Sequence, residues 1–257
     1  PWTLPSNLGL AVGNDLDYVA VKDKNSGRTF ILGASLWKSA FGKNSQDPSV
    51  DSNFEVLKTF KGKDLLGLTY EPLFDYFANK KSEGAFKVIW SDHVTTDSGS
   101  AVVHMAPAFG EDDYYACKRE GIPIVNPVDD DGMFTAQVPP HAGKRVKDAD
   151  KDIIAELKKS GRLVKQDTLV HSYPFCPRTD TPLIYRAVSS WFVKVEAIKE
   201  KILNANKTTS WVPDHLKEGR FGNWLENARD WAISRNRFWG TPLPIWRNKD
   251  GEMICIG

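Results

Sequence analysis

Cysteine is scarce in this sequence. Only three cysteines occur in 257 residues, and they are scattered at Cys117, Cys176 and Cys255. An odd number of widely separated cysteines excludes the disulfide framework that stabilises many small secreted domains. We therefore expect a protein of a reducing compartment, the cytoplasm.

The sequence also lacks an excess of either charge and lacks any long apolar run. Its 34 basic and 33 acidic residues leave a formal net charge of +1, so contact with a polyanion has to depend on local patches. No apolar stretch approaches about 18 residues and no secretory leader is evident, so we expect no membrane partner. The chain opens at Pro1 without Met, which indicates a segment of a longer chain.

Motifs for several kinds of chemistry are missing. The segment "GRFGNW" has neither the spacing nor the lysine of a phosphate-binding loop, and no G-x-S-x-G elbow occurs. The five histidines are dispersed, and "PFCPRTDTP" has Thr179 where a zinc knuckle needs a second cysteine. We therefore expect no metal site, and no motif supports a nucleophilic enzyme.

The pattern of apolar residues indicates an α+β fold. We expect a hairpin over 18–32, around the turn signal at 24–27, and further strands over 53–62, 85–95, 101–107 and 181–195. Helices are expected over 111–121, 148–161, 196–206 and 220–234. The expected architecture is a mixed β-sheet or β-barrel with peripheral helices over 1–180, followed by an extended strand and helix connector over 181–257.

The stretch "AVVHMAPAFGEDDYYAC" carries the most unusual chemistry. His104 lies on an apolar strand-like run, and a turn then leads to three acids, Glu111, Asp112 and Asp113, at the start of an expected helix. Each acid there stabilises the helix dipole by roughly 0.3–1 kcal/mol, so capping alone is one explanation, with His104 as a satisfied core histidine. At helical spacing Glu111 and Asp113 point about 200° apart. An inward carboxylate would suit an ammonium group, so a pocket for a small cationic ligand is the other explanation.

Three segments of the chain resemble known signatures. "PWTLPSN", "AVVHMAPAFGEDDY" and "DWAISRNRFWGTPLPIW" resemble, in that order, three signatures of class I aminoacyl-tRNA synthetases of the isoleucine/valine/leucine group. They belong there to the large editing insertion that interrupts the nucleotide-binding core. The tail is similar to the isoleucyl enzymes, and "APAFGEDDY" most resembles the eukaryotic cytosolic type and its bacterial relatives. The resemblance spans nearly the whole chain.

The resemblance implies a hydrolytic function. It implies post-transfer editing, and pre-transfer editing as a further option, in which valyl-tRNA for isoleucine is hydrolysed without a cofactor. The implied partners are the tRNA for isoleucine with its mischarged valyl ester, the valine moiety, and the rest of the synthetase chain, which would ligate isoleucine with ATP and Mg. The motifs that bind ATP are absent from this chain. A valyl- or leucyl-type editing domain and a non-catalytic module that positions tRNA stay open as alternatives.

The resemblance also implies the site residues. Trp2, Thr3 and Asn7 would surround the ester and the terminal adenosine, and Thr3 would orient a water. Asp113 would hold the α-ammonium and position the substrate without acting as the base. The remaining two implied residues are His104, lining the side-chain pocket, and Tyr173, at its wall.

Three further features lead to expectations. The family usually reads Gly-Thr-Gly where this chain has Gly99-Ser100-Ala101, so Ala101 adds a methyl where backbone approaches closely. A basic cluster at Lys144, Arg145, Lys147 and Lys151 would suit phosphates, but interleaved aspartates largely cancel it and favour a solvated helix start. The tail tryptophans, Trp224, Trp231 and Trp239, are expected to pack structurally or face the missing core, leaving exposed apolar surface.

Overall fold

The computed structural model describes residues 1–42, 47–168, 170–235 and 240–256. Their contacts divide the chain into two compact units, Pro1–Ala187 and Val188–Gly257, which are described separately below. The functional division into a hydrolytic domain over 1–180 and a connector over 181–257 stays a prediction.

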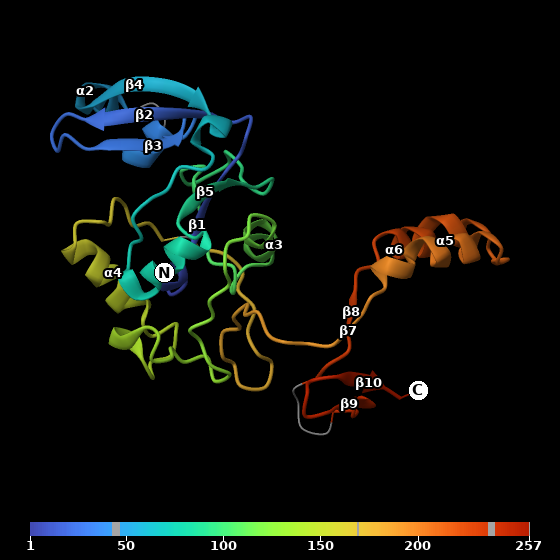
Figure 1. The fold of residues 1–257 in the computed structure, drawn as a ribbon. Coiled ribbons are helices and arrows are strands. Elements are labelled where there is room, and N and C mark those ends of the chain that lie inside the picture. Colours follow the sequence, from blue (N-terminus) through green and yellow to red (C-terminus); the bar gives the residue numbers. More distant parts are fainter. Residues whose placement is uncertain (43–46, 169, 236–239, 257) are drawn as a thin grey trace. The chain divides into compact units, whose positions relative to one another are not determined.

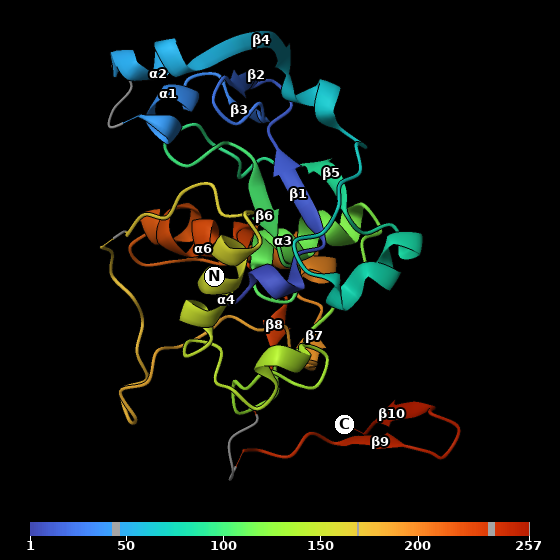
Figure 2. The same cartoon turned by 90° about the vertical axis from the view of Figure 1, so that its left-hand side faces the viewer.

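The first unit is built on a small mixed sheet in the order β5-β1-β6. The central strand β1 (Gly9–Val12) runs parallel to β5 (Lys87–Trp90) and antiparallel to β6 (Val103–Met105), as Figure 2 shows. Ala11 and Val12 are fully buried because β1 is covered by the main core of the unit. The register pairs Leu10 with His104, which brings the predicted site histidine beside the start of β1.

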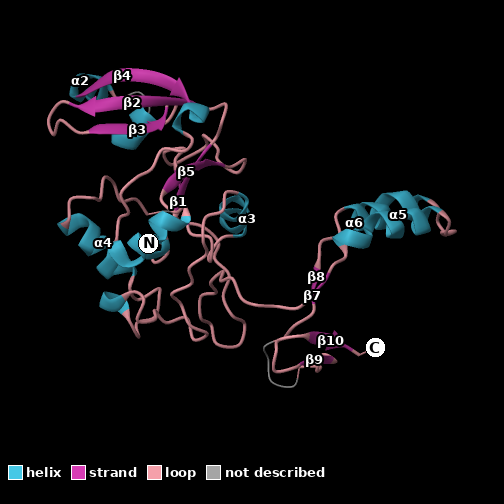
Figure 3. Ribbon diagram, in the orientation of Figure 1, coloured by secondary structure: helices cyan, strands magenta, loops and turns pink. Residues whose placement is uncertain are grey.

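A second sheet of the first unit has the order β3-β2-β4. Its strands are β2 (Asp17–Asp23), β3 (Thr29–Gly33) and β4 (Phe54–Lys61), all antiparallel (Figure 3). The predicted hairpin is confirmed: Gly27 has φ 70° in its turn, a conformation that glycine adopts at little cost. The helices α1 (Trp37–Phe41) and α2 (Pro48–Asn53) lie beside this sheet and bury a small cluster around Val21 and Trp37.

Two longer helices of the first unit confirm the sequence prediction. They are α3 (Glu111–Arg119) and α4 (Asp150–Lys159), and each has acids in its first turn and basic residues in its last turn. That distribution complements the helix dipole at both ends. In α4 the predicted apolar stripe is buried through Ile153 and Leu157. Short 3₁₀ helices occupy Leu4–Ser6, Gly62–Leu65, Asp75–Glu83 and Pro139–His141.

The second unit departs from the prediction in two places. The helix expected over 196–206 is confirmed as a 3₁₀ turn, Glu196–Ile198, followed by α5 (Lys199–Lys207). The strand expected over 181–195 reduces to β7 (Phe192–Val193), because the rest of that run pairs with no strand in the described part of the chain, apart from an isolated bridge at Pro182. The helix expected over 220–234 is wrong after its first turns: a π-helical turn (Lys217–Phe221) and α6 (Gly222–Glu226) are followed by β8 (Trp231–Ala232), which pairs with β7. A hairpin of β9 (Ile245–Arg247) and β10 (Met253–Cys255) completes the unit.

The fold is therefore α+β, with several small sheets and helices at their periphery. The strands of the described segments form no closed barrel, since each sheet has only two or three strands and open edges. Of the two architectures that the sequence left open, the mixed sheet is the one present. No helix in the described ranges has the length and apolarity needed to cross a bilayer.

Candidate functional site

The N-terminal segment is bonded to the C-terminal end of β6. The backbone N–H of Leu8 donates to the carbonyl of Met105, the last residue of β6, at 3.0 Å, and the 3₁₀ turn Leu4–Ser6 comes just before Leu8 in the chain. As a result Thr3 and Asn7, on either side of the turn, both face His104. Three of the predicted site residues are thus brought together across almost a hundred positions of sequence.

Both ring nitrogens of His104 have partners. Asn7 Nδ2 donates to His104 Nδ1 at 2.8 Å and to the carbonyl of Gly9 at 2.9 Å, while Asn7 Oδ1 accepts from the Tyr70 hydroxyl at 2.6 Å. The carbonyl of Gly9 can only accept, so the amide orientation is determined, and Nδ1 must be the acceptor. The neutral ring therefore carries its proton on Nε2 and donates it to Thr3 Oγ1 at 3.1 Å.

The surroundings keep His104 uncharged. Burial lowers the pKa of His104 to about 4, because the charged ring would lose hydration without gaining an acidic partner. A neutral imidazole does not repel a cationic ligand. The Thr3 hydroxyl accepts the His104 proton, and among the described residues no acceptor takes the hydroxyl's own hydrogen. Thr3 can therefore still donate one hydrogen bond to a ligand or a water.

Asp113 points back over the start of α3. Its Oδ2 accepts a hydrogen bond of 2.8 Å from the backbone N–H of Ala106, two residues after His104. Glu111 and Asp112 are exposed whereas Asp113 is half-buried, in agreement with the divergent directions that helical spacing predicts. Burial raises the pKa of Asp113, and the Ala106 N–H and the nearby His93 act in the opposite direction. Oδ1 accepts no hydrogen bond from another residue in the part of the chain that the structure describes.

A glycine makes room for this carboxylate. A Cβ built on Gly110 would lie 2.9 Å from Asp113 Cγ and 3.1 Å from Oδ2. Gly110 has extended backbone angles that any residue adopts, so the requirement is steric. Sequence reasoning missed this role, although the position of Gly110 directly before the three acids was a signal that could have indicated it.

The loop 106–110 is held from three sides. Ala106 is bonded to Asp113, the ring of Phe109 packs edge-on against Trp2 with centroids 4.8 Å apart, and the carbonyl of Ala108 accepts from the N–H of Ala187 at 2.7 Å. Through this loop Asp113 is connected with the Trp2–Thr3 segment rather than bonded directly to His104. Trp2 itself is 8% exposed, so most of its ring is taken up by packing.

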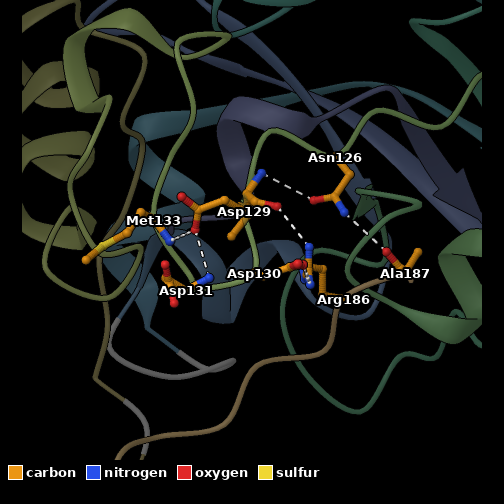
Figure 4. A network of polar contacts seen from close by, with 8 residues as sticks. Asn126, Asp129, Asp130, Asp131, Met133, Arg186 and Ala187 are labelled. Atoms are coloured by element: carbon orange, nitrogen blue, oxygen red, sulfur yellow. Dashed lines mark hydrogen bonds and ion pairs between the residues drawn. The ribbon is translucent and has the colours of Figure 1, made fainter. Parts of the chain in front are cut away.

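A polar network around Arg186 and Ala187 supports the hydrogen bond between Ala187 and Ala108 (Figure 4). Asn126 Nδ2 donates to the carbonyl of Ala187 at 3.2 Å, and Arg186 donates to the carbonyl of Val128 at 3.2 Å and pairs with Asp130. Within the turn, Asp129 Oδ1 accepts from the N–H groups of the second and fourth residues that follow it. The network holds residues 186–187 against the turn and hence against Ala108.

Tyr173 joins the group through a lysine. Lys147 Nζ lies 4.5 Å from the centroid of the Tyr173 ring and 5.8 Å from that of Trp2. The Tyr173 hydroxyl donates to the carbonyl of Leu183 at 2.6 Å, which fixes the ring in the 171–175 loop. Tyr173 and Trp2 therefore share Lys147 as a neighbour, and among the described residues Tyr173 makes no hydrogen bond or ring contact with Asp113 or His104.

The position at which the resemblance implies glycine has an unusual backbone. Ala101 has φ 56° and is buried, and its carbonyl accepts from the Tyr18 hydroxyl at 2.7 Å. Left-handed backbone costs a residue with a Cβ roughly 1–2 kcal/mol. The extra methyl fits because Gly33 lies opposite: a Cβ built there would be 2.9 Å from the Ala101 Cβ. The departure from the family pattern is thus accommodated by a neighbouring glycine.

Other possible sites lie elsewhere. Within the described segments, no group of three or more His, Cys, Asp or Glu side chains is arranged to hold a metal ion. A cavity of about 790 Å³ opens between β3, α1 and the loops 97–100 and 164–167, and none of the six predicted site residues lines it. Trp224 and Trp231 are exposed, at 65% and 61%, as predicted for the tail, while Trp239 lies outside the described residues.

Relatives of the chain were found by sequence. It is 69% identical over 257 residues to an isoleucine–tRNA ligase of Bdellovibrio bacteriovorus, a match that covers 100% of this chain and 24% of that protein. It is 54% identical to an isoleucine–tRNA ligase of Chlamydia pneumoniae and 52% identical to a cytoplasmic isoleucine–tRNA ligase of Arabidopsis thaliana, each with 100% of this chain and 24% of the relative covered. The chain spans about a quarter of the length of these curated relatives.

Two solved structures share a weaker likeness. "The crystal structure of GlLeuRS-CP1" has a TM-score of 0.47 and 14% identity, with 67% of this chain and 82% of that chain covered. The P. knowlesi cytosolic leucyl-tRNA synthetase editing domain has a TM-score of 0.43 and 12% identity, with 73% and 82% covered. By sequence, the family model of "tRNA synthetases class I (I, L, M and V)" matches residues 17–257, which is most of the chain. The chain therefore belongs to the class I tRNA synthetases of the isoleucine, leucine, methionine and valine group.

Proposed function

We propose that this chain hydrolyses valine that has been wrongly esterified to the tRNA for isoleucine, as the editing segment of an isoleucine-specific synthetase. The observation that carries the proposal is the placement of two groups around the loop 106–110. His104, uncharged and bonded to Thr3, lies two residues before Ala106, and the backbone N–H of Ala106 binds the half-buried Asp113, whose Oδ1 is available. Identity of 69% to an isoleucine–tRNA ligase supports the choice of amino acid.

The need for such a site follows from simple energetics. A pocket that binds isoleucine cannot strongly reject valine, because one methylene changes binding by only about 1–3 kcal/mol, and this pair is itself the standard example of that limit. A second, smaller pocket can exclude isoleucine by size and hydrolyse what fits. In the proposed role, the longer synthetase ligates isoleucine with ATP and Mg, and the present chain acts on its tRNA product without a cofactor.

The proposed chemistry divides between the two groups. Asp113 Oδ1 accepts a charge-assisted hydrogen bond from the α-ammonium of valine and so places the ester carbonyl near Thr3. The Thr3 hydroxyl, whose oxygen accepts from His104, donates its hydrogen to the oxygen of an attacking water and orients it. Water adds to the carbonyl carbon and releases a proton, the bond from that carbon to the ribose oxygen breaks, and the ribose oxygen takes up the released proton. The products are free valine and uncharged tRNA, and His104 faces the amino-acid side chain.

The test is the deacylation of valyl- and isoleucyl-tRNA for isoleucine. It is run with the 257-residue chain and with the Bdellovibrio ligase in which this chain replaces the matching segment. We expect the valyl ester to be cleaved faster than the isoleucyl ester. Spontaneous rates for both esters, in both proteins, would refute the proposal, and cleavage of threonyl-tRNA for valine in their place would identify a valyl-type editing domain.

A further inference from the structure

Lys147 occupies an unusual place between two aromatic rings. Its Nζ lies 4.5 Å from the centroid of Tyr173 and 5.8 Å from that of Trp2, one residue before Thr3. The side chain is only partly exposed. Ring faces attract an ammonium group and hold it in place without neutralising its charge. The structure therefore positions a full positive charge beside the candidate site.

Nearby acids do not pair with this charge. Asp150 accepts the backbone N–H of Trp2 at 2.8 Å, and Asp152 is paired with Lys144. Asp148 is exposed, and Lys147 makes no ion pair with any carboxylate in the described ranges. Two of the three aspartates that were expected to cancel the basic cluster are thus engaged elsewhere. Lys147 keeps ammonium hydrogens on the side away from the rings, where they are available to an anion.

We propose that Lys147 is a phosphate-binding residue for the phosphodiester next to the esterified nucleoside. The proposal rests on the proposed function, in which that nucleoside lies at Thr3 and Asn7. Trp2 connects Lys147 with the proposed nucleoside position, because the centroid of its ring lies 5.8 Å from Lys147 Nζ and its backbone continues into Thr3. For a tRNA whose terminal nucleoside binds at Thr3, we therefore expect the adjacent phosphate to lie near Trp2 and Lys147. Lysine binds phosphate as a point charge, so it requires no particular sequence.

The first experiment separates phosphate binding from a purely structural role. Hydrolysis of valyl-tRNA for isoleucine is compared with hydrolysis of the valyl ester of adenosine, which has no phosphate, in the 257-residue chain. We expect Lys147→Met to raise KM for the tRNA ester about tenfold with kcat unchanged, and to change KM for the adenosine ester less than twofold. Lys147→Arg should keep KM for the tRNA ester near the parent value. Lys151→Met, the same substitution at an exposed position on α4, is the matched control and should leave both substrates unchanged.

A second experiment does not depend on catalysis. Binding of an oligonucleotide with the sequence of the tRNA 3′ end is measured against salt concentration, with thermal melts of each variant. Lys147→Met should weaken binding about tenfold and reduce the slope of log K against log salt by about 0.7, the value for one phosphate of a single strand.

The outcomes are distinguishable. Equal loss with both esters would mean that Lys147 only supports the rings of Trp2 and Tyr173, and an unchanged salt slope would also overturn the phosphate assignment. If the parent chain cleaves neither ester but Lys147→Met still lowers the salt slope, the proposed function fails and the phosphate site stands.

Discussion

The position of Asp113 allows its charge to be tested separately from its hydrogen bond. Oδ2 holds the Ala106 N–H at 2.8 Å, and Oδ1 is the atom assigned to the α-ammonium. Asp113→Asn keeps an oxygen acceptor for Ala106 and removes the negative charge. Asp113→Ala removes both. Asp113→Asn therefore tests the charge alone, and Asp113→Ala tests the charge together with the hydrogen bond to Ala106.

The magnitudes follow from those contacts. A hydrogen bond between an ammonium group and a carboxylate contributes about 1.5–3 kcal/mol, so Asp113→Asn should slow hydrolysis of the valyl ester by roughly tenfold or more. Its unfolding free energy should change by less than about 1 kcal/mol, because the bond to Ala106 survives. Asp113→Ala should lose the same activity and also about 1–3 kcal/mol of stability, because the N–H of the buried Ala106 is left without an acceptor. The structure thus adds a stability cost that helix capping alone would not predict.

The assay is single-turnover deacylation of valyl-tRNA for isoleucine, with thermal melts of each variant. Asp112→Asn is the matched control, with the same charge change on the same helix turn but an exposed side chain. It should leave the rate within twofold of the parent. Equal rates for Asp112→Asn and Asp113→Asn would reduce Asp113 to a residue that secures the helix start, and the assignment of the ammonium site would be wrong.

Four further predictions concern other parts of the chain. His104→Ala should enlarge the side-chain pocket, so the ratio of isoleucyl to valyl ester hydrolysis should rise more than valyl hydrolysis falls; an unchanged ratio with lower stability would indicate a structural histidine. The pKa of His104 is about 4 in the folded chain and 6.5 in the unfolded chain, so the unfolded chain binds the proton first as pH falls. The unfolding free energy of the parent relative to His104→Gln should therefore be constant above pH 6.5 and decline by up to about 3 kcal/mol towards pH 4, as denaturant titrations would measure. Gly110→Ala places a Cβ 2.9 Å from Asp113 Cγ and should cost activity that is not additive with Asp113→Asn, since both act on one carboxylate; additive losses would place its effect elsewhere. Trp231, 61% exposed in the second unit, should keep its fluorescence when a non-hydrolysable valyl-adenosine analogue binds to a variant with Trp231 as the sole tryptophan, and ligand-dependent quenching would contradict that placement.

Local features were determined by the sequence because their causes are local. The hairpin around Gly27 follows from turn residues between β-prone runs, and α3 and α4 follow from acids at one end and basic residues at the other. Where the structure of a segment depended on a distant partner strand, the prediction from local sequence was wrong. The residues around Trp231 form β8 because they pair with β7, and the run 181–195 stays mostly outside sheets because few of its backbone groups find a partner strand.

The candidate site depended on tertiary structure in the same way. Sequence motifs indicated the family and the candidate site residues. Helical spacing suggested that Glu111 and Asp113 point in different directions, and the resemblance implied that Asp113 is the one that holds the ligand. Only the pairing of β1 with β6 brings Thr3 to His104, 101 positions apart, and closes the chain of bonds through Asn7 to Tyr70. The insertion of Lys147 between two rings and the fit of Ala101 against Gly33 have the same origin. Contacts of this kind depend on the register and packing of distant segments, which a single sequence does not display in any local pattern.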